Sequence, residues 1–225
     1  MLEEFRSAEI TKIVELSPRV REFTLTPSKP IEFIPGQFIV INGQGVERSY
    51  SISNSPGNKD IEIIVSLNSS GILSPWLFSL KLGANINISE PKGQFVLPPI
   101  VDKDICFICT GTGLGPFKSM IEGLSHLFKG QIYLIFGNRK KEDILYHEKW
   151  QNMAKSTNFN YMPVLSQEKW DGHQGYVHEV YKELFAKNKD VMIYVCGWQA
   201  MCKEARMHLK ELGFGRRDYK FEQYD

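Results

Sequence analysis

The sequence predicts two domains: an antiparallel β-barrel over residues 1–99, then a doubly wound parallel α/β sheet over residues 100–225. Two observations support this fold class. In the first part, short runs of β-forming residues are separated by turn residues, at the spacing of an antiparallel barrel. Beyond Leu97-Pro98-Pro99, apolar runs alternate with amphipathic segments, which is typical of a parallel sheet whose strands are joined by helices.

The first domain is expected to contain five strands and one short helix. The strands are predicted at residues 8–16, 20–26, 37–41, 49–53 and 60–67. Turn signals such as Pro35-Gly36 separate them. The helix is predicted over residues 74–82, with Ser74 as its N-cap and Pro75 at the first helical position.

The second domain is expected to alternate strands with helices. Strands are predicted at residues 105–109, 132–136, 160–165, 192–196 and 219–222. Helices are predicted at residues 116–128, 143–153, 177–185 and 200–212. In the first helix, Phe117, Met120, Ile121 and Leu124 recur at helical spacing, and Gly130 and Gly213 are expected to follow helix ends.

Composition narrows the functional classes. The 225 residues are 42% hydrophobic and carry a net charge of +1, which excludes a disordered chain and argues against bulk nucleic-acid binding. The acidic start and the absence of an apolar run near the roughly 20 residues of a membrane span predict a soluble, cytoplasmic protein. We expect a monomer.

The four cysteines do not form a metal site by their spacing. Cys106 and Cys109 lie in one predicted strand, and no second close pair or nearby histidine completes a ligand set. We expect buried, reduced thiols and no metal. Any redox function must therefore use an organic cofactor.

A glycine-rich loop, Thr110-Gly111-Thr112-Gly113-Leu114-Gly115-Pro116, lies between a predicted strand and a predicted helix. Glycines allow a diphosphate to approach the backbone, and the helix N-terminus offers free N–H groups. Pro116 departs from the usual dinucleotide fingerprint, and Gly137-Asn138-Arg139 lacks the acid that binds ribose. A turn without a ligand is the alternative.

Several motifs occur in one order along the chain. They are Pro35-Gly36-Gln37-Phe38, Arg48-Ser49-Tyr50-Ser51 with the following residues to Pro56, Leu73-Ser74-Pro75, Pro91-x-Gly93-x-Phe95, the glycine-rich loop, and Cys196-Gly197-x-x-x-Met201. This series resembles the ferredoxin–NADP reductase superfamily, and within it the bacterial ferredoxin (flavodoxin)–NADP reductases. The resemblance covers nearly the whole chain.

The resemblance implies FAD on the barrel and NAD(P)H on the α/β domain. Hydride would pass from the nicotinamide to flavin N5, and electrons would leave to a ferredoxin or flavodoxin. The implied FAD-binding residues are Arg48, Ser49, Tyr50, Ser51, Ile64, Val65, Ser66, Ile72, Leu73, Ser74, Thr110 and Tyr224. The implied NAD(P)-binding residues are Thr110, Gly111, Thr112, Gly113, Leu114, Gly115, Pro116, Asn138, Arg139, Ser166, Gln167, Cys196, Gly197 and Met201.

Three residues are implied in the reaction itself. Ser51 is a small donor for flavin N5, and Cys196 is expected beside the nicotinamide as a packing group, not a nucleophile. Glu222 is the one acid expected to relay a proton. Tyr224 either covers the flavin or closes the final strand by ordinary packing.

Two departures from the family pattern concern the nicotinamide cofactor. Gln167 and Tyr176 stand where the family has arginines that hold the 2′-phosphate of NADPH. Losing two such partners, each worth roughly 1.5–3 kcal/mol, predicts use of NADH or of both cofactors. Arg139 and Lys169 are the candidate replacements.

Two other functions remain open at this point. A free-flavin reductase would bind flavin only transiently and purify colourless, and a regulatory subunit would bind flavin or nucleotide without catalysis. A carrier protein docks by charge complementarity, and Arg216, Arg217 and Lys220 form the compact basic cluster expected near the C-terminal edge.

Overall fold

The computed structural model describes residues 5–124, 128–155 and 158–224. The chain forms two compact units. The first contains residues 1–97 together with 115–124, and the second contains residues 98–114 together with 125–225. No helix in the described ranges is long and apolar enough to cross a membrane.

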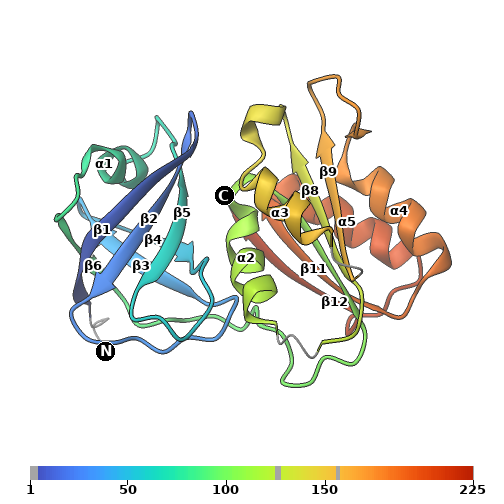
Figure 1. Ribbon diagram of the computed structural model, residues 1–225, viewed down its shortest axis with the longest axis horizontal. Helices are drawn as coiled ribbons and strands as arrows, with labels where there is room; N and C mark the ends of the chain where they lie inside the picture. Colours follow the sequence, from blue (N-terminus) through green and yellow to red (C-terminus); the bar gives the residue numbers. More distant parts are fainter. Residues whose placement is uncertain (1–4, 125–127, 156–157, 225) are drawn as a thin grey trace. The chain divides into compact units, whose positions relative to one another are not determined.

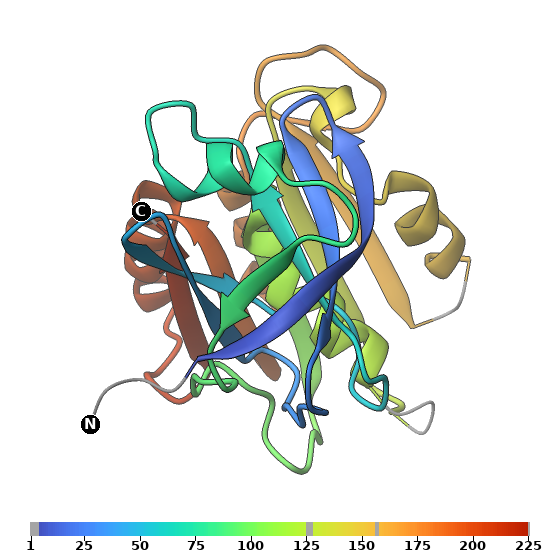
Figure 2. The same ribbon diagram turned by 90° about the vertical axis from the view of Figure 1, so that its left-hand side faces the viewer.

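The first unit is built on a six-stranded antiparallel sheet in the order β4-β3-β6-β1-β2-β5. An isolated bridge between Ile52, just after β4, and Ile63 of β5 joins the two edges, so the sheet closes on itself (Figures 1 and 2). The predicted antiparallel architecture is confirmed. The elements are β1 (Arg6–Ser17), β2 (Val20–Pro27), β3 (Phe38–Gly43), β4 (Val46–Ser51), β5 (Ile61–Ser66), α1 (Leu73–Ser79) and β6 (Asn85–Ile88).

Three details of the first unit differ from the prediction. The short strand β6 was not predicted. Ser74 is not the N-cap of α1: that position is Ile72, without a side-chain cap. Ser74 Oγ instead accepts a hydrogen bond from the amide of Asn68 at 2.9 Å. The helix ends at Ser79, before the predicted residue 82, because Leu80 is extended.

The second unit is a six-stranded parallel sheet in the order β10-β9-β8-β7-β11-β12, which confirms the predicted doubly wound fold. Its strands are β7 (Asp104–Thr110), β8 (Ile132–Asn138), β9 (Phe159–Leu165), β10 (His173–Gln174), β11 (Val191–Trp198) and β12 (Tyr219–Tyr224). Chain order runs outward from β7 in one direction and from β11 in the other, so the switch point of the topology lies between these two neighbours.

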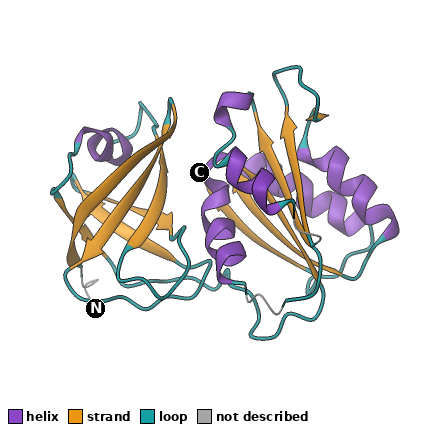
Figure 3. Ribbon diagram, in the orientation of Figure 1, coloured by secondary structure: helices purple, strands orange, loops and turns teal. Residues whose placement is uncertain are grey.

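Helices connect the parallel strands (Figure 3). They are the 3₁₀ helices η1 (Gly111–Gly113) and η2 (Lys141–Asp143), with α2 (Leu114–Gly123), α3 (His147–Met153), α4 (Val177–Lys187) and α5 (Gln199–Glu211). The predicted helix over 143–153 is shorter because Tyr146 has a φ of +55°. Helix α2 begins before the predicted residue 116 and ends at Gly123, and residues 125–127 of its predicted span lie outside the described residues.

Candidate flavin and nucleotide sites

Strand β4 carries the predicted flavin-binding residues Arg48, Ser49, Tyr50 and Ser51 in a row. Arg48 and Ser49 are exposed, Tyr50 is half-buried and Ser51 is buried. The Arg48 Nη1 group donates a hydrogen bond to the Glu47 carbonyl at 2.7 Å, which leaves other donors of the guanidinium fork for a ligand. Burial raises the pKa of Tyr50 to about 12, against the opposing charge of Arg48.

The start of α1 offers a second set of donors. Among the described residues, the amides of Ile72, Leu73 and Ser74 meet no hydrogen-bond acceptor, as expected for the first turn of a helix. The Ser74 hydroxyl is already hydrogen-bonded to Asn68, so only its backbone is available. Helix α1 contacts β4, which places these amides on the element next to Arg48.

The donor set of the first unit fits a dinucleotide with a flat, apolar ring. A planar cation and three amides suit a diphosphate, and the ring of Tyr50 suits a flavin ring. The predicted residues of β5 add Ile64 and Val65, which are buried, and Ser66, which is exposed. The residues present therefore match what FAD requires.

In the second unit, the glycine-rich loop packs against the loop that follows β11. A Cβ on Gly113 would collide with the Cys196 carbonyl oxygen and lie 2.9 Å from Gly197 Cα. Gly197 has a φ of +143°, and a Cβ there would collide with Thr110 Oγ1. That hydroxyl accepts a hydrogen bond from the amide of Trp198 at 3.4 Å.

These two loops meet at the carboxyl ends of β7 and β11, the switch point of the sheet. Open α/β sheets bind ligands at this place. Gly111 has a φ of +53° with open space where a Cβ would point, and Thr112 lies with it in η1. Leu114, Gly115 and Pro116 form the first turn of α2, where the missing N–H of proline removes no helical hydrogen bond.

The structure brings together the three predicted residues Cys196, Glu222 and Tyr224. Cys196 pairs with Glu222 in the parallel register of β11 and β12. The Tyr224 hydroxyl donates to Glu222 Oε1 at 3.5 Å and hydrogen-bonds with Cys196. Burial, then the charge of Glu222, raise the pKa of the Cys196 thiol well above its usual value. The thiol is therefore neutral, which suits a packing group and not a nucleophile.

Met201 lies in helix α5, directly after the Cys196-Gly197 loop. Its Cε would be 3.1 Å from a Cβ placed on Gly197, and it is half-buried in the first turns of α5. Trp198 lies between Gly197 and Met201 and is 65% exposed. It was not singled out from the sequence, because exposure of a large aromatic residue becomes visible only in the structure.

The predicted residues after β8 and β9 also come together. The amides of Ser166 and Gln167 donate to the carbonyls of Asn138 and Arg139, each at 3.0 Å. Beside them is an open hollow of about 610 Å³ lined by Lys140, Lys141, Glu142, Gln167 and Glu168.

The acids of this hollow were missed by sequence reasoning. Glu168 Oε2 accepts a hydrogen bond from the Lys141 amide at 2.8 Å, and Lys140 Nζ lies 3.8 Å from Glu142 Oε1. The sequence does show an acid, Glu168, directly after Gln167. Its place beside Lys141 becomes clear only when β8 and β9 are known to pair. Lys169, a predicted replacement cation, is exposed and does not line the hollow.

All four cysteines are free and buried, as predicted. The basic cluster Arg216, Arg217 and Lys220 is exposed. Tyr176 is also exposed, and its ring stacks on that of His178 with centroids 5.6 Å apart.

Comparison with known proteins agrees with this geometry. Residues 7–97 match the oxidoreductase FAD-binding domain model, and residues 107–207 match the oxidoreductase NAD-binding domain model. Ferredoxin--NADP reductase B of Sorangium cellulosum is 31% identical, over 97% of this chain and 97% of that protein. The Phenol hydroxylase P5 protein of Acinetobacter pittii is 30% identical over 96% of this chain, which spans 65% of that relative. Protein RfbI of Salmonella typhimurium is 34% identical over 78% of this chain, which matches 54% of RfbI.

Solved structures show the same fold. The Amycolatopsis cytochrome P450 reductase GcoB superposes with a TM-score of 0.91 at 24% identity, over 99% of this chain and 71% of that one. A ferredoxin NADP+ reductase from Neisseria gonorrhoeae superposes with a TM-score of 0.87 at 22% identity, over 97% of this chain and 98% of that one. The chain thus belongs to the ferredoxin–NADP reductase family of FAD- and NAD-binding oxidoreductases.

Proposed function

We propose that this oxidoreductase takes electrons from NADH onto FAD and passes them to a separate redox protein of the ferredoxin or flavodoxin type. The observation that carries the proposal is the meeting of the glycine-rich loop with Cys196-Gly197 at the switch point of the parallel sheet. Two matched relatives are themselves named as a ferredoxin--NADP reductase and a reductase component of a phenol monooxygenase.

Bound FAD supplies the redox chemistry, accepting a hydride and releasing electrons singly or in pairs. In this proposal the protein binds and orients. Arg48 and the amides of residues 72–74 hold the diphosphate, Tyr50 packs on the ring, and Ser51 offers its hydroxyl to the reacting edge. Orientation of this kind lowers a barrier without a general acid or base for the hydride step.

In the second unit, the neutral Cys196 packs beside the nicotinamide. Glu222 Oε1 accepts the proton of the Tyr224 hydroxyl in a hydrogen bond, and this carboxylate is the group we assign to proton relay. We also propose that Tyr224 covers the flavin. A separate proposal is that the chain divides at residue 99 into an FAD-binding and an NAD(P)-binding domain.

The hollow beside Gln167 supports NADH as the preferred cofactor. Carboxylates of Glu142 and Glu168 line it, where they repel a 2′-phosphate and accept hydrogen bonds from ribose hydroxyls. Lys140 and Lys141 bring the formal charge of the lining to zero, but the Lys140 ammonium already lies near Glu142. Gln167 is uncharged and stands where the family has an arginine, so it offers no positive charge to a 2′-phosphate.

Steady-state kinetics of the purified protein test the proposal. We expect a yellow protein whose kcat/KM for NADH exceeds that for NADPH, with electrons delivered to ferredoxin or flavodoxin. Gln167→Arg should raise kcat/KM for NADPH by about tenfold, the effect of one charge-assisted hydrogen bond, and Lys169→Arg, outside the hollow, should not. A preference of about a hundredfold for NADPH in the wild type would contradict NADH use.

The spectrum and an acceptor panel distinguish the alternatives. Colourless protein that reduces added flavin would indicate a free-flavin reductase. Yellow protein that oxidises neither NADH nor NADPH with any acceptor would indicate a regulatory subunit. Arg216→Glu with Arg217→Glu should raise the KM for an acidic carrier and leave the rate with a small neutral acceptor unchanged.

A further inference from the structure

We propose that Lys118 and Ser119 of α2 are positioning residues for the flavin: they fix the backbone segment Ser51–Asn54, which begins with the serine assigned to the flavin's reacting edge. The inference rests on the proposed function, in that it takes Ser51 as a flavin contact. All of its contacts lie within the first unit, which contains residues 115–124.

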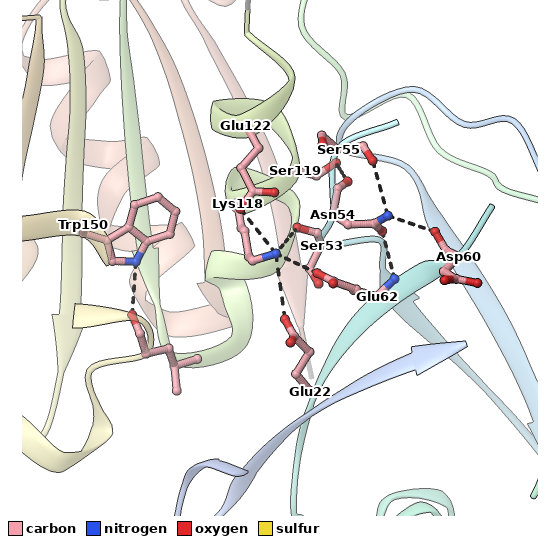
Figure 4. A network of polar contacts seen from close by, with 11 residues as sticks. Glu22, Ser53, Asn54, Ser55, Asp60, Glu62, Lys118, Ser119, Glu122 and Trp150 are labelled. Carbon is pink, nitrogen blue, oxygen red and sulfur yellow. Dashed lines mark hydrogen bonds and ion pairs between the residues drawn. The ribbon is translucent and has the colours of Figure 1, made fainter. Parts of the chain in front are cut away.

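Two side chains of α2 bind two successive carbonyls of this segment (Figure 4). Lys118 Nζ donates to the Ser53 carbonyl at 3.2 Å, and Ser119 Oγ donates to the Asn54 carbonyl at 2.6 Å. Gly115 of α2 packs beside Ser51, because a Cβ placed on this glycine would lie 3.7 Å from Ser51 Cβ. Helix α2 therefore contacts the segment near its first residue and holds both of its last two.

Strand β5 holds the same segment by other groups. The amide of Ser53 donates to the Glu62 carbonyl at 2.8 Å, and the amide of Glu62 donates to Asn54 Oδ1 at 2.9 Å. Glu62 also accepts a hydrogen bond from Lys118 Nζ on Oε2, at 2.8 Å. The Lys118 ammonium thus hydrogen-bonds both to the Ser51–Asn54 segment and to β5, the strand that supports this segment.

The charges around Lys118 suit a geometric role. Lys118 is 5% exposed, and it also lies 3.8 Å from Glu22 and 3.4 Å from Glu122. Burial lowers its pKa, but the hydrogen bond that Lys118 donates to Glu62 and the charges of all three carboxylates outweigh this, so the net pKa is raised and the ammonium persists. Buried ion pairs of this kind contribute little net stability, since desolvation offsets attraction. What the network does provide is one fixed geometry for the carbonyls it binds.

The test uses the FAD-loaded holoenzyme and three variants. Ser119→Ala removes one hydrogen bond and leaves the charge cluster intact. Lys118→Met removes the central cation. Lys103→Met is the matched control, because this lysine forms an exposed pair with Asp190 at 3.1 Å in the second unit. FAD release on dilution is followed by flavin fluorescence, together with the visible spectrum and midpoint potential of the bound flavin.

We expect FAD affinity to fall about tenfold in Lys118→Met and about threefold in Ser119→Ala, with a shifted spectrum and potential, and no change in Lys103→Met. A purely structural role would lower the melting temperature without moving the potential or spectrum. Folded variants with wild-type FAD release, spectrum and potential would overturn the inference. If Lys118→Met does not fold, Ser119→Ala decides alone. Failure of the wild type to oxidise NADH would refute the proposed function instead.

Discussion

The substitution Gly113→Ala adds one methyl group and tests whether the glycine-rich loop packs against the Cys196-Gly197 loop as described. Gly113 is buried, and an added Cβ would collide with the Cys196 carbonyl oxygen, 2.7 Å from the carbonyl carbon and 2.9 Å from Gly197 Cα. All three are backbone atoms, so no side chain can rotate away. The strain is relieved only if the glycine-rich loop and the Cys196-Gly197 loop move apart.

Forcing an extra methyl into a packed region costs about 1–3 kcal/mol. For a chain of 225 residues, each kcal/mol corresponds to about 2–4 °C in melting temperature. Because these loops are where we place the nicotinamide dinucleotide, we also expect the Kd for NADH to rise about tenfold. FAD should stay bound, since Arg48 and α1 belong to the first unit and are untouched.

Gly213→Ala, outside the glycine-rich loop, is the matched control. Its φ of +88° imposes left-handed strain, about 1–2 kcal/mol, but nothing lies within 4 Å of the new Cβ. Calorimetric titration with NADH and thermal unfolding of the two holoenzymes give the comparison. If Gly113→Ala binds NADH and unfolds like the wild type, the two loops do not pack as described and the reasoning is refuted.

Three further predictions address other parts of the account. Arg48→Met should weaken FAD binding by about 10- to 100-fold, the worth of hydrogen bonds to a charged diphosphate, and an affinity within about twofold of the wild type would exclude Arg48 from the site. None of the four buried thiols should react with a disulfide reagent in the native protein at neutral pH, whereas the unfolded protein should react at all four; a single fast thiol in the native protein would contradict the burial of all four. Because burial raises the pKa of Tyr50 to about 12, while an unfolded tyrosine titrates near about 10, its contribution to stability is complete below pH 10 and is lost between about pH 10 and 12. Tyr50→Phe should therefore lose less stability over this window in denaturant titrations, and identical slopes would contradict the assignment.

The strongly patterned elements could be predicted from sequence alone. The apolar runs of β7 and β11 and the helical period of α5 leave little choice of structure. The strand β6 was missed because Asn85-Ile86-Asn87-Ile88 is short and asparagine is rare in strands, and it forms only because β1 and β3 pair with it on either side.

The errors in the site have a common cause, which is contact between residues that no local sequence pattern indicates. Ser74 has the right residue type for an N-cap, but Asn68 engages its hydroxyl. Glu168 lies in a loop without any motif, and it lines the hollow beside Gln167 only because β8 and β9 pair. Lys118 reads as one polar residue in an amphipathic helix, and its carboxylate partners come from β2, β5 and α2.

Anaerobic mixing of the purified, FAD-loaded protein with NADH is the most direct test of the central claim. We expect NADH to bleach the visible absorption of the bound flavin in full at one equivalent, and NADPH to do so more slowly. The reduced protein should then regain its colour on addition of oxidised ferredoxin or flavodoxin. An absorption spectrum that neither nicotinamide changes would contradict the account.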